Sequence, residues 1–107
     1  IESALTRFAT NLSPIWTYRF ASTGATYAAL GPTGTQFAAF TSKSAIKGIS
    51  NWKPSKPTAL LLTFDSKGAI ADARTATGVP LALGYSKDLG TVLMSSGQTA
   101  VSIFRLT

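Results

Sequence analysis

The second half of the chain consists of short apolar runs separated by turn-forming residues. The apolar runs are TALLLTF at 58–64, VPLALGY at 79–85, TVLM at 91–94 and TAVSIF at 99–104. Residues 65–68, 87–90 and 95–97 lie between them and are rich in Ser, Lys, Asp and Gly, which favour tight turns. Such short links join antiparallel neighbours, because parallel strands need a crossover of roughly a dozen residues or more. Residues 58–107 are therefore predicted to form an antiparallel β-meander.

The start of the chain has a different apolar spacing. Ile1, Leu5, Phe8 and Leu12 recur at intervals of three and four residues, which is typical of one face of an α-helix. Pro14 opposes continuation, because proline lacks a backbone donor and clashes with the preceding helical turn. The pattern predicts a helix over residues 1–13, with these four side chains packed on a sheet.

Residues 15–41 return to the period of a β-strand. Trp16, Tyr18 and Phe20 alternate with polar residues. Turn signals at 22–24 and 31–34 then bound two further predicted strands, at 25–30 and 35–41. The sequence as a whole predicts one domain over residues 1–107 with an α+β fold, in which an N-terminal helix packs on an antiparallel β-sheet.

Residues 42–57 are predicted to form a long, basic surface loop, because two prolines exclude a central strand. The loop carries four lysines and one tryptophan and has no acidic residue; these candidate nucleic-acid-binding residues are Lys43, Lys47, Trp52, Lys53 and Lys56. Lysines that contact phosphates beside an aromatic ring that stacks on bases would suit a nucleic acid. The alternative interpretation is that the tryptophan anchors the loop on the sheet while the lysines stay in water.

The residue types needed for most catalytic sites are missing or scattered. The 107 residues include no cysteine and no histidine, which removes thiol nucleophiles, zinc sites and the commonest general base. Asp65 and Asp88 lie in turns, where aspartate accepts backbone hydrogen bonds, and no Gly-x-Ser-x-Gly motif is present. The sequence predicts a protein that is not an enzyme and holds no metal or cofactor.

The net charge of the chain is +6, from ten Lys and Arg against four Asp and Glu. A basic protein attracts polyanions such as nucleic acids and anionic lipids. The same charge also serves solubility alone, so both interpretations stay open.

Two segments resemble a known family. LLTFDSKGA at 61–69 and TVLMSSGQTAVSIF at 91–104 are similar to strand–turn–strand segments of type IV pilin-like proteins, especially type II secretion minor pseudopilins and minor type IV pilins. The chain departs from the family in lacking the long apolar N-terminal helix and the cysteine pair of many type IV pilins. The resemblance implies a pilin-like head whose apolar membrane helix would precede residue 1.

The function implied by this resemblance is that of a non-enzymatic filament subunit, in a type IV pilus, a DNA-uptake pilus or a type II secretion filament. Its partners would be other pilin subunits, inner-membrane assembly machinery and the membrane itself. Its location would be the cell surface or periplasm, with inner-membrane anchoring before assembly. The alternatives are a DNA-binding minor pilin that uses the 42–57 loop and an unrelated small β-rich binding domain.

Overall fold

The computed structural model describes residues 2–50, 52, 54–76, 78–96 and 101–105, with only the backbone of 96 and 101–105. Strands make up 57% of the chain, so the protein is nearly all β. The elements are β1 (Glu2–Phe8), β2 (Pro14–Ala21), β3 (Tyr27–Leu30), the 3-10 turn η1 (Pro32–Gly34), β4 (Gln36–Ser42), β5 (Thr58–Phe64), β6 (Ile70–Ala76), β7 (Pro80–Ser86), β8 (Thr91–Ser96) and β9 (Val101–Arg105).

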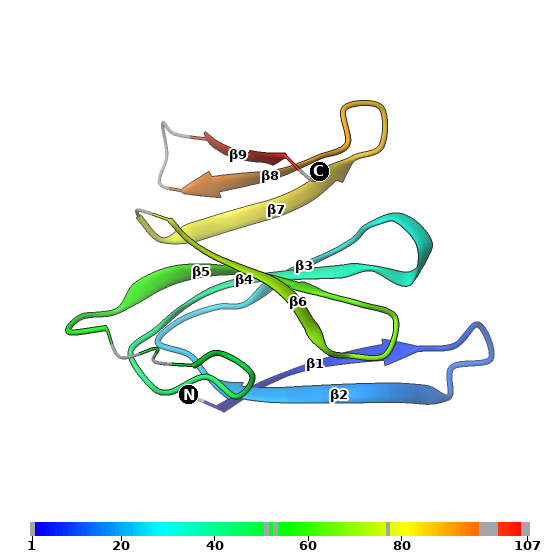
Figure 1. Cartoon of the computed structure of the whole chain (residues 1–107), viewed down its shortest axis with the longest axis horizontal. Helices are drawn as coiled ribbons and strands as arrows, with labels where there is room; N and C mark the ends of the chain where they lie inside the picture. The colour runs from blue at the N-terminus through cyan, green and yellow to red at the C-terminus, as the bar shows by residue number, and fades with distance from the viewer. Residues whose placement is uncertain (1, 51, 53, 77, 97–100, 106–107) are drawn as a thin grey trace.

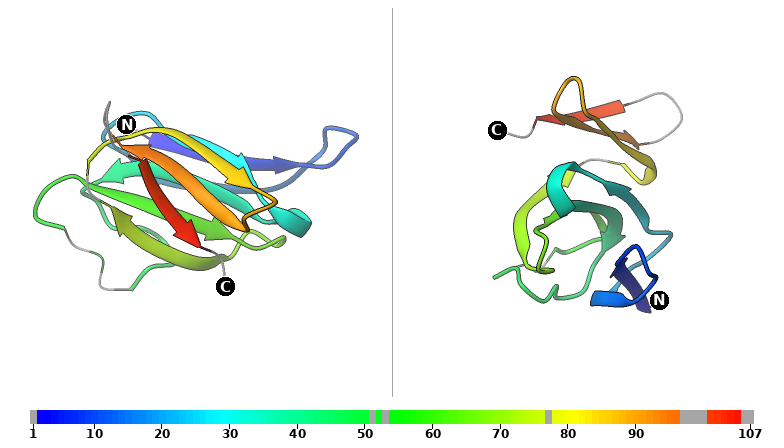
Figure 2. Two further views of the ribbon diagram at one scale, coloured as in Figure 1. Left: turned by 90° about the horizontal axis from the view of Figure 1, so that it is seen from above. Right: turned by 90° about the vertical axis from the view of Figure 1, so that its right-hand side faces the viewer.

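These strands form three antiparallel sheets that lie in layers. The orders are β1-β2, β3-β4-β5-β6 and β7-β8-β9. Figure 1 shows the β1–β2 hairpin below the four-stranded sheet and the β7–β9 sheet above it, and the right-hand view of Figure 2 shows the same order from another side. The four-stranded sheet is therefore the central layer.

The central position of this sheet explains the composition of β4 and β5. Every residue of β4 is buried, and so are five of the seven in β5. Alternating residues of β4 serve different cores, with Ala38 and Phe40 on the hairpin side and Phe37 and Ala39 on the β7–β9 side. A strand buried on both faces has no polar face, so its sequence loses the usual alternation.

Aromatic contacts join the central sheet to each outer layer. On the hairpin side, Phe20 of β2 stacks on Phe40 with ring centroids 4.1 Å apart, and Tyr18 lies 5.0 Å from Phe64. On the other side, Phe37 stacks on Tyr85 of β7 at 5.7 Å. Such pairs contribute about 0.5–1.5 kcal/mol each beyond the area they bury.

The predicted α+β fold is wrong, because residues 2–8 form a strand and none of the described residues forms a helix that packs on the sheet. Leu5 is buried, as the helical pattern required, but Phe8 and Leu12 are exposed instead of packed on the sheet. Ile1 lies outside the described residues. The physical reason is that β1 pairs along its whole length with β2, and such pairing overrides a local helical spacing.

Most of the other predicted elements are confirmed. Strands occur at or near 16–20, 25–30, 35–41, 58–64, 79–85 and 91–94, and all the described pairings are antiparallel. The strand predicted at 99–104 is found from residue 101 on, and residues 99 and 100 lie outside the described part of the chain. The described residues of the 43–57 segment contain no strand. The predicted meander, however, divides between two sheets. No apolar run predicted β6, although the resemblance of 61–69 implied that a strand follows the turn. Within the described residues, no helix has the length and apolar character needed to cross a bilayer.

Candidate anion-binding groove

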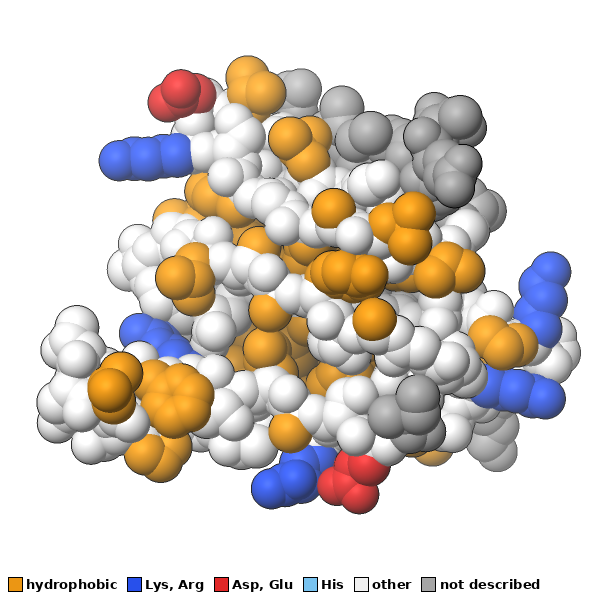
Figure 3. All heavy atoms as spheres, turned by 180° about the vertical axis from the view of Figure 1, so that it is seen from behind, with side chains coloured by type: hydrophobic (Ala, Val, Ile, Leu, Met, Phe, Trp, Pro, Cys, Tyr) orange, Lys and Arg blue, Asp and Glu red, His pale blue; other side chains and the backbone are white. Residues whose placement is uncertain are grey.

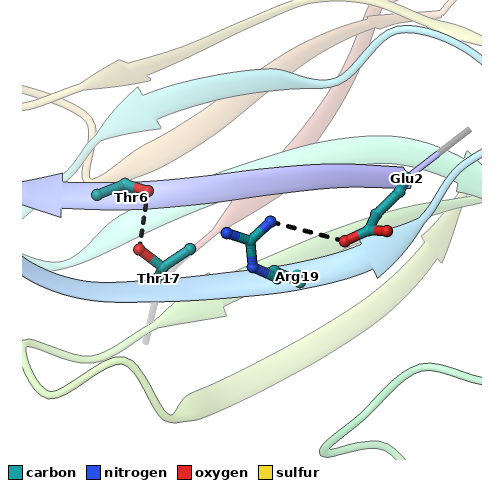
Figure 4. Close-up of polar contacts among 4 residues, drawn as sticks. All are labelled: Glu2, Thr6, Thr17 and Arg19. Atoms are coloured by element: carbon teal, nitrogen blue, oxygen red, sulfur yellow. Dashed lines mark hydrogen bonds and ion pairs between the residues drawn. The ribbon is translucent and has the colours of Figure 1, made fainter.

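The middle of the outer face of the β1–β2 hairpin carries polar side chains that are open to solvent. Thr6 and Thr17 face each other across the two strands with their hydroxyl oxygens 3.0 Å apart, and the Arg19 guanidinium lies 3.6 Å from a Glu2 carboxylate oxygen (Figure 4). The Arg19 and Glu2 side chains are both largely exposed, and an exposed pair of this kind contributes only about 0–1 kcal/mol. Arg19 can therefore exchange this partner for another anion at little cost.

A groove lies along β2, between the hairpin, the loop that follows β4 and the turn between β5 and β6. Its volume is about 560 Å³, and its lining residues are Thr17, Tyr18, Arg19, Lys47, Gly48, Gly68, Ala69 and Ile70. Three segments that are far apart in the sequence thus meet at one site. Two of the lining residues, Arg19 and Lys47, carry exposed cationic side chains and none carries a carboxylate, so the groove favours an anion.

Tyr18 fixes the loop wall of the groove. Its hydroxyl donates a hydrogen bond to the backbone carbonyl oxygen of Lys47, and its ring is buried against Phe20 and Phe64. Burial raises the pKa of the Tyr18 phenol above its ordinary value, because the charged phenolate loses solvation. The neutral, donating form of Tyr18 is thus the stable one, and it holds the Lys47 backbone beside β2.

Two glycines allow the other segments to approach closely. Gly48 has a φ of +97°, and a Cβ there would lie 2.9 Å from Ile70 Cδ1. Gly68 has a φ of +88°, and a Cβ there would lie 2.8 Å from the Trp16 ring. Positive φ and close contact both favour glycine over other residues. The walls of the groove therefore depend on these two glycines.

The turn between β5 and β6 is built by Asp65, as its sequence predicts. Its carboxylate accepts hydrogen bonds from the backbone nitrogens of Ala69, at 3.0 Å, and Lys67, at 2.8 Å. These bonds hold the pKa of Asp65 below its usual range, because they stabilise the charged form. Asp65 therefore serves the turn, while the exposed Lys67 adds a positive charge next to Gly68 of the groove.

The structure separates the residues predicted to bind nucleic acid. Lys47 lines the groove, whereas Lys56 lines a different cavity, near the start of β5. Lys43 is exposed just after β4, and Lys53 lies outside the described residues. Trp52 is half-buried and packs against the core cluster on the hairpin side, a position that corresponds to the anchoring interpretation of its role.

Arg19 is the groove residue that the sequence interpretation missed. It belongs to the exposed set of β2, which alternates with the buried Tyr18 and Phe20. The alternation indicated an outward side chain, but only the fold places it near a loop 28 residues later. A groove that combines residues 19 and 47 has no local sequence signature.

The described residues bring no metal-binding cluster together. Among them, no group of three His, Cys, Asp or Glu side chains could hold a metal ion. The chain matches no protein-family model, and a search of curated proteins finds no relative. The chemistry of the groove is thus the basis for a functional proposal.

Proposed function

We propose that this chain is a non-enzymatic, β-rich binding module whose groove holds the phosphate backbone of a single-stranded nucleic acid. The observation that carries the proposal is the placement of Arg19 and Lys47 in one groove. Arginine and lysine neutralise phosphates and release the counterions bound to them, which drives sequence-independent binding.

The size of the groove favours a strand over a duplex. Pockets of about 300–1,000 Å³ hold ligands of drug size, and the groove volume of about 560 Å³ lies in this range. The groove itself would therefore hold about one or two nucleotides. Exposed Lys43 and Lys67 offer further phosphate contacts beyond it, so a longer strand binds better than a free nucleotide.

The position of Trp52 favours binding through charge rather than through base stacking. Trp52 packs on the core, so its ring is not free to serve as an open stacking platform of the kind that single-strand-binding proteins use. The proposal therefore assigns little base preference to the site. Glu2 competes with phosphate for Arg19, because the two side chains already form an exposed ion pair.

The pilin-like filament function stays an untested prediction, and so do the surface or periplasmic location and the membrane partners. Its structural premise was a helix over residues 1–13, which is absent from the described residues. The alternative of a small β-rich binding domain requires no such helix, and we adopt it.

The proposal is tested by fluorescence anisotropy with a labelled single-stranded oligonucleotide over a range of salt concentrations. The logarithm of the binding constant should fall linearly with the logarithm of salt, with a slope of about −0.7 per phosphate neutralised. Arg19→Ala and Lys47→Ala should each weaken binding and reduce the slope by about 0.7. Glu2→Gln should strengthen binding, because it removes the competing carboxylate.

Lys87→Ala is the matched control. Lys87 is exposed in the turn between β7 and β8, in the layer on the far side of the central sheet (Figure 1). Its loss changes the net charge as Lys47→Ala does, but leaves the groove intact. Equal losses in the Lys47 and Lys87 variants would show that binding follows net charge alone, and would contradict the proposed site.

A further inference from the structure

A buried glutamine of the central sheet has no hydrogen-bond partner for its amide oxygen. Gln36, the first residue of β4, is 7% exposed, and its Oε1 bonds to none of the described residues. The other buried polar side chains of β4 are bonded, Thr41 to Thr23 and Ser42 to the carbonyl oxygen of Ala21. A buried polar atom without a partner weakens a fold. Folding alone therefore does not explain a glutamine at this position.

Gln36 lines a cavity between the end of β1, the end of β3 and the η1 turn. The volume of this cavity is about 430 Å³, and its lining also includes Thr6, Arg7, Phe8, Leu30 and Gly34. Figure 1 shows the end of β1 and the turn between β3 and β4 at the same end of the molecule. Figure 3, seen from behind, shows a basic side chain between apolar ones at the left of the molecule. We call this cavity the β1 recess.

Arg7 is held in place at the β1 recess and keeps donors to spare. Its Nη1 donates hydrogen bonds to the carbonyl oxygens of Gly34, at 3.0 Å, and Ser66, at 3.2 Å. Gly34 has a φ of +77°, and a Cβ there would lie 2.6 Å from Arg7 Nη1, so glycine lets the guanidinium approach this closely. Nε and Nη2 of Arg7 donate to none of the described residues. These nitrogens are therefore available to a ligand.

The β1 recess also has an exposed aromatic ring. Phe8 lines it and is 56% exposed, whereas Trp52 packs on the core beside the hairpin. Phe8 thus offers the open stacking surface that Trp52 does not. An aromatic ring, an amide with a free acceptor and a guanidinium with free donors together suit a planar ligand with a polar edge. Unstacked nucleic-acid bases are bound in this way, by stacking on a ring and by hydrogen bonds to their edges.

We propose that the β1 recess binds one unpaired base of the strand whose phosphates lie in the groove, so this inference rests on the proposed function. The base stacks on Phe8, and its edge bonds to the Gln36 amide and to the free donors of Arg7. Base edges present donors beside acceptors, and glutamine and arginine are frequent partners of such edges. A base in a duplex is stacked and paired, so it does not enter the recess. The groove thus supplies contacts to phosphate, and the recess supplies the contact to a base.

The β1 recess and the groove lie on the two sides of one hairpin. Thr6 lines the recess and Thr17 lines the groove, and their hydroxyl oxygens are 3.0 Å apart across the hairpin. The turn after β5 reaches both sites, because its Ser66 carbonyl oxygen accepts from Arg7 and its Gly68 lines the groove. A strand of a few nucleotides can therefore cross the exposed threonine pair from one site to the other.

Fluorescence anisotropy with two strands of equal length and charge, one intact and one made of abasic nucleotides, tests the proposal. The wild-type chain should bind the intact strand about 5- to 100-fold more tightly, as expected for one bidentate base contact. Gln36→Met should remove most of this preference and leave binding of the abasic strand unchanged. It should not lower the urea midpoint, because it removes an unpartnered buried oxygen. Thr91→Val is the matched control, since it removes another buried oxygen that bonds to none of the described residues, in β8, and it should keep the preference.

Phe8→Ala is a second variant that the fold should tolerate, because its ring is exposed. It should reduce the preference for the intact strand, while Ile15→Ala, at a residue that is 51% exposed, should not.

The outcomes separate this inference from the proposed function. Lys47→Ala should weaken binding of both strands equally. If it does so while the wild-type chain binds both strands alike, or while Gln36→Met keeps the preference, the base site is wrong and the groove stands. Free nucleosides carry a base and no phosphate, and at millimolar concentration at least one of them should shift the NMR signals of the Gln36 side-chain amide. Such a shift without strand binding would contradict the groove and support the recess, and neither shift nor strand binding would overturn both.

Discussion

Replacing Tyr18 by phenylalanine removes a hydroxyl that ties β2 to the groove loop, while it keeps the ring in the core. The hydroxyl donates to the Lys47 carbonyl oxygen, and a hydrogen bond of this kind contributes about 0.5–1.5 kcal/mol to stability. The ring contacts to Phe20 and Phe64 remain, so no cavity forms. Tyr18→Phe should therefore lower the free energy of unfolding by about 1 kcal/mol, or roughly 4–8 °C in the melting temperature.

The same substitution should change how stability depends on pH. Because burial raises the pKa of Tyr18 in the folded state, the folded protein binds this proton more tightly than the unfolded chain does. This contribution to stability is fully present below the unfolded value of about 10 and is lost as pH rises through the folded pKa. The phenylalanine variant has no such group, so the gap in stability between the two proteins should narrow above about pH 10.

Urea unfolding followed by circular dichroism at several pH values measures both effects. Oligonucleotide binding provides a further readout, since a loosened Lys47 wall should weaken binding even though no charge is removed. Equal stability of the two proteins at neutral pH, together with parallel pH profiles, would refute the role assigned to the Tyr18–Lys47 bond.

Two further substitutions test how the hairpin is held to the central sheet. Arg7→Ala should lower the free energy of unfolding by about 1.5–3 kcal/mol, because Arg7 donates hydrogen bonds of 3.0 and 3.2 Å to carbonyl oxygens in the turns after β3 and β5; an unchanged urea midpoint would contradict this. Gly68→Ala should lower the melting temperature, because its Cβ would lie 2.8 Å from the Trp16 ring at a φ of +88°. Gly84→Ala is its control, with nothing within 4 Å of the added Cβ, and equal losses in both variants would contradict the close-approach argument.

The apolar runs and turn residues were enough to predict most of the strands, because their signals are local. In β5, for example, the run 58–64 is bounded by prolines on one side and an Asp–Gly turn on the other. How these strands divide between sheets depends instead on which faces meet. Phe37 and Phe40 lie on opposite faces of β4, and the sequence alone does not assign each face to a partner layer.

The error over residues 1–13 has a specific cause. The inward-facing set of β1 contains Ser3, Leu5 and Arg7, of which only Leu5 is apolar. Ser3 lies 2.9 Å from Ser22 between their hydroxyl oxygens, and Arg7 bonds to backbone carbonyls. With polar residues on its inner face, β1 shows no apolar alternation. The exposed Phe8 at its end and Leu12 in the following turn complete a helical spacing by chance. A strand whose inward-facing side chains mainly form hydrogen bonds cannot be recognised from the spacing of apolar residues.

The groove was predictable only in part. The density of lysines in residues 43–56 singled out Lys47, since charge runs are visible in a sequence. Arg19 was hidden, because its neighbourhood arises from the packing of β2 beside a distant loop. The exposure of Leu12 and its positive φ were not predicted either, because both are properties of the folded chain.

The central claim is that a single-stranded nucleic acid lies in the groove of Arg19 and Lys47. Titration of an oligonucleotide into isotope-labelled protein, followed by amide NMR spectra, tests it most directly. Binding should shift the signals of residues 17–19, 47–48 and 68–70 and leave those of the β7–β8 turn unchanged. Shifts that spread evenly over all exposed lysines, or that gather in the β7–β9 sheet, would contradict the claim.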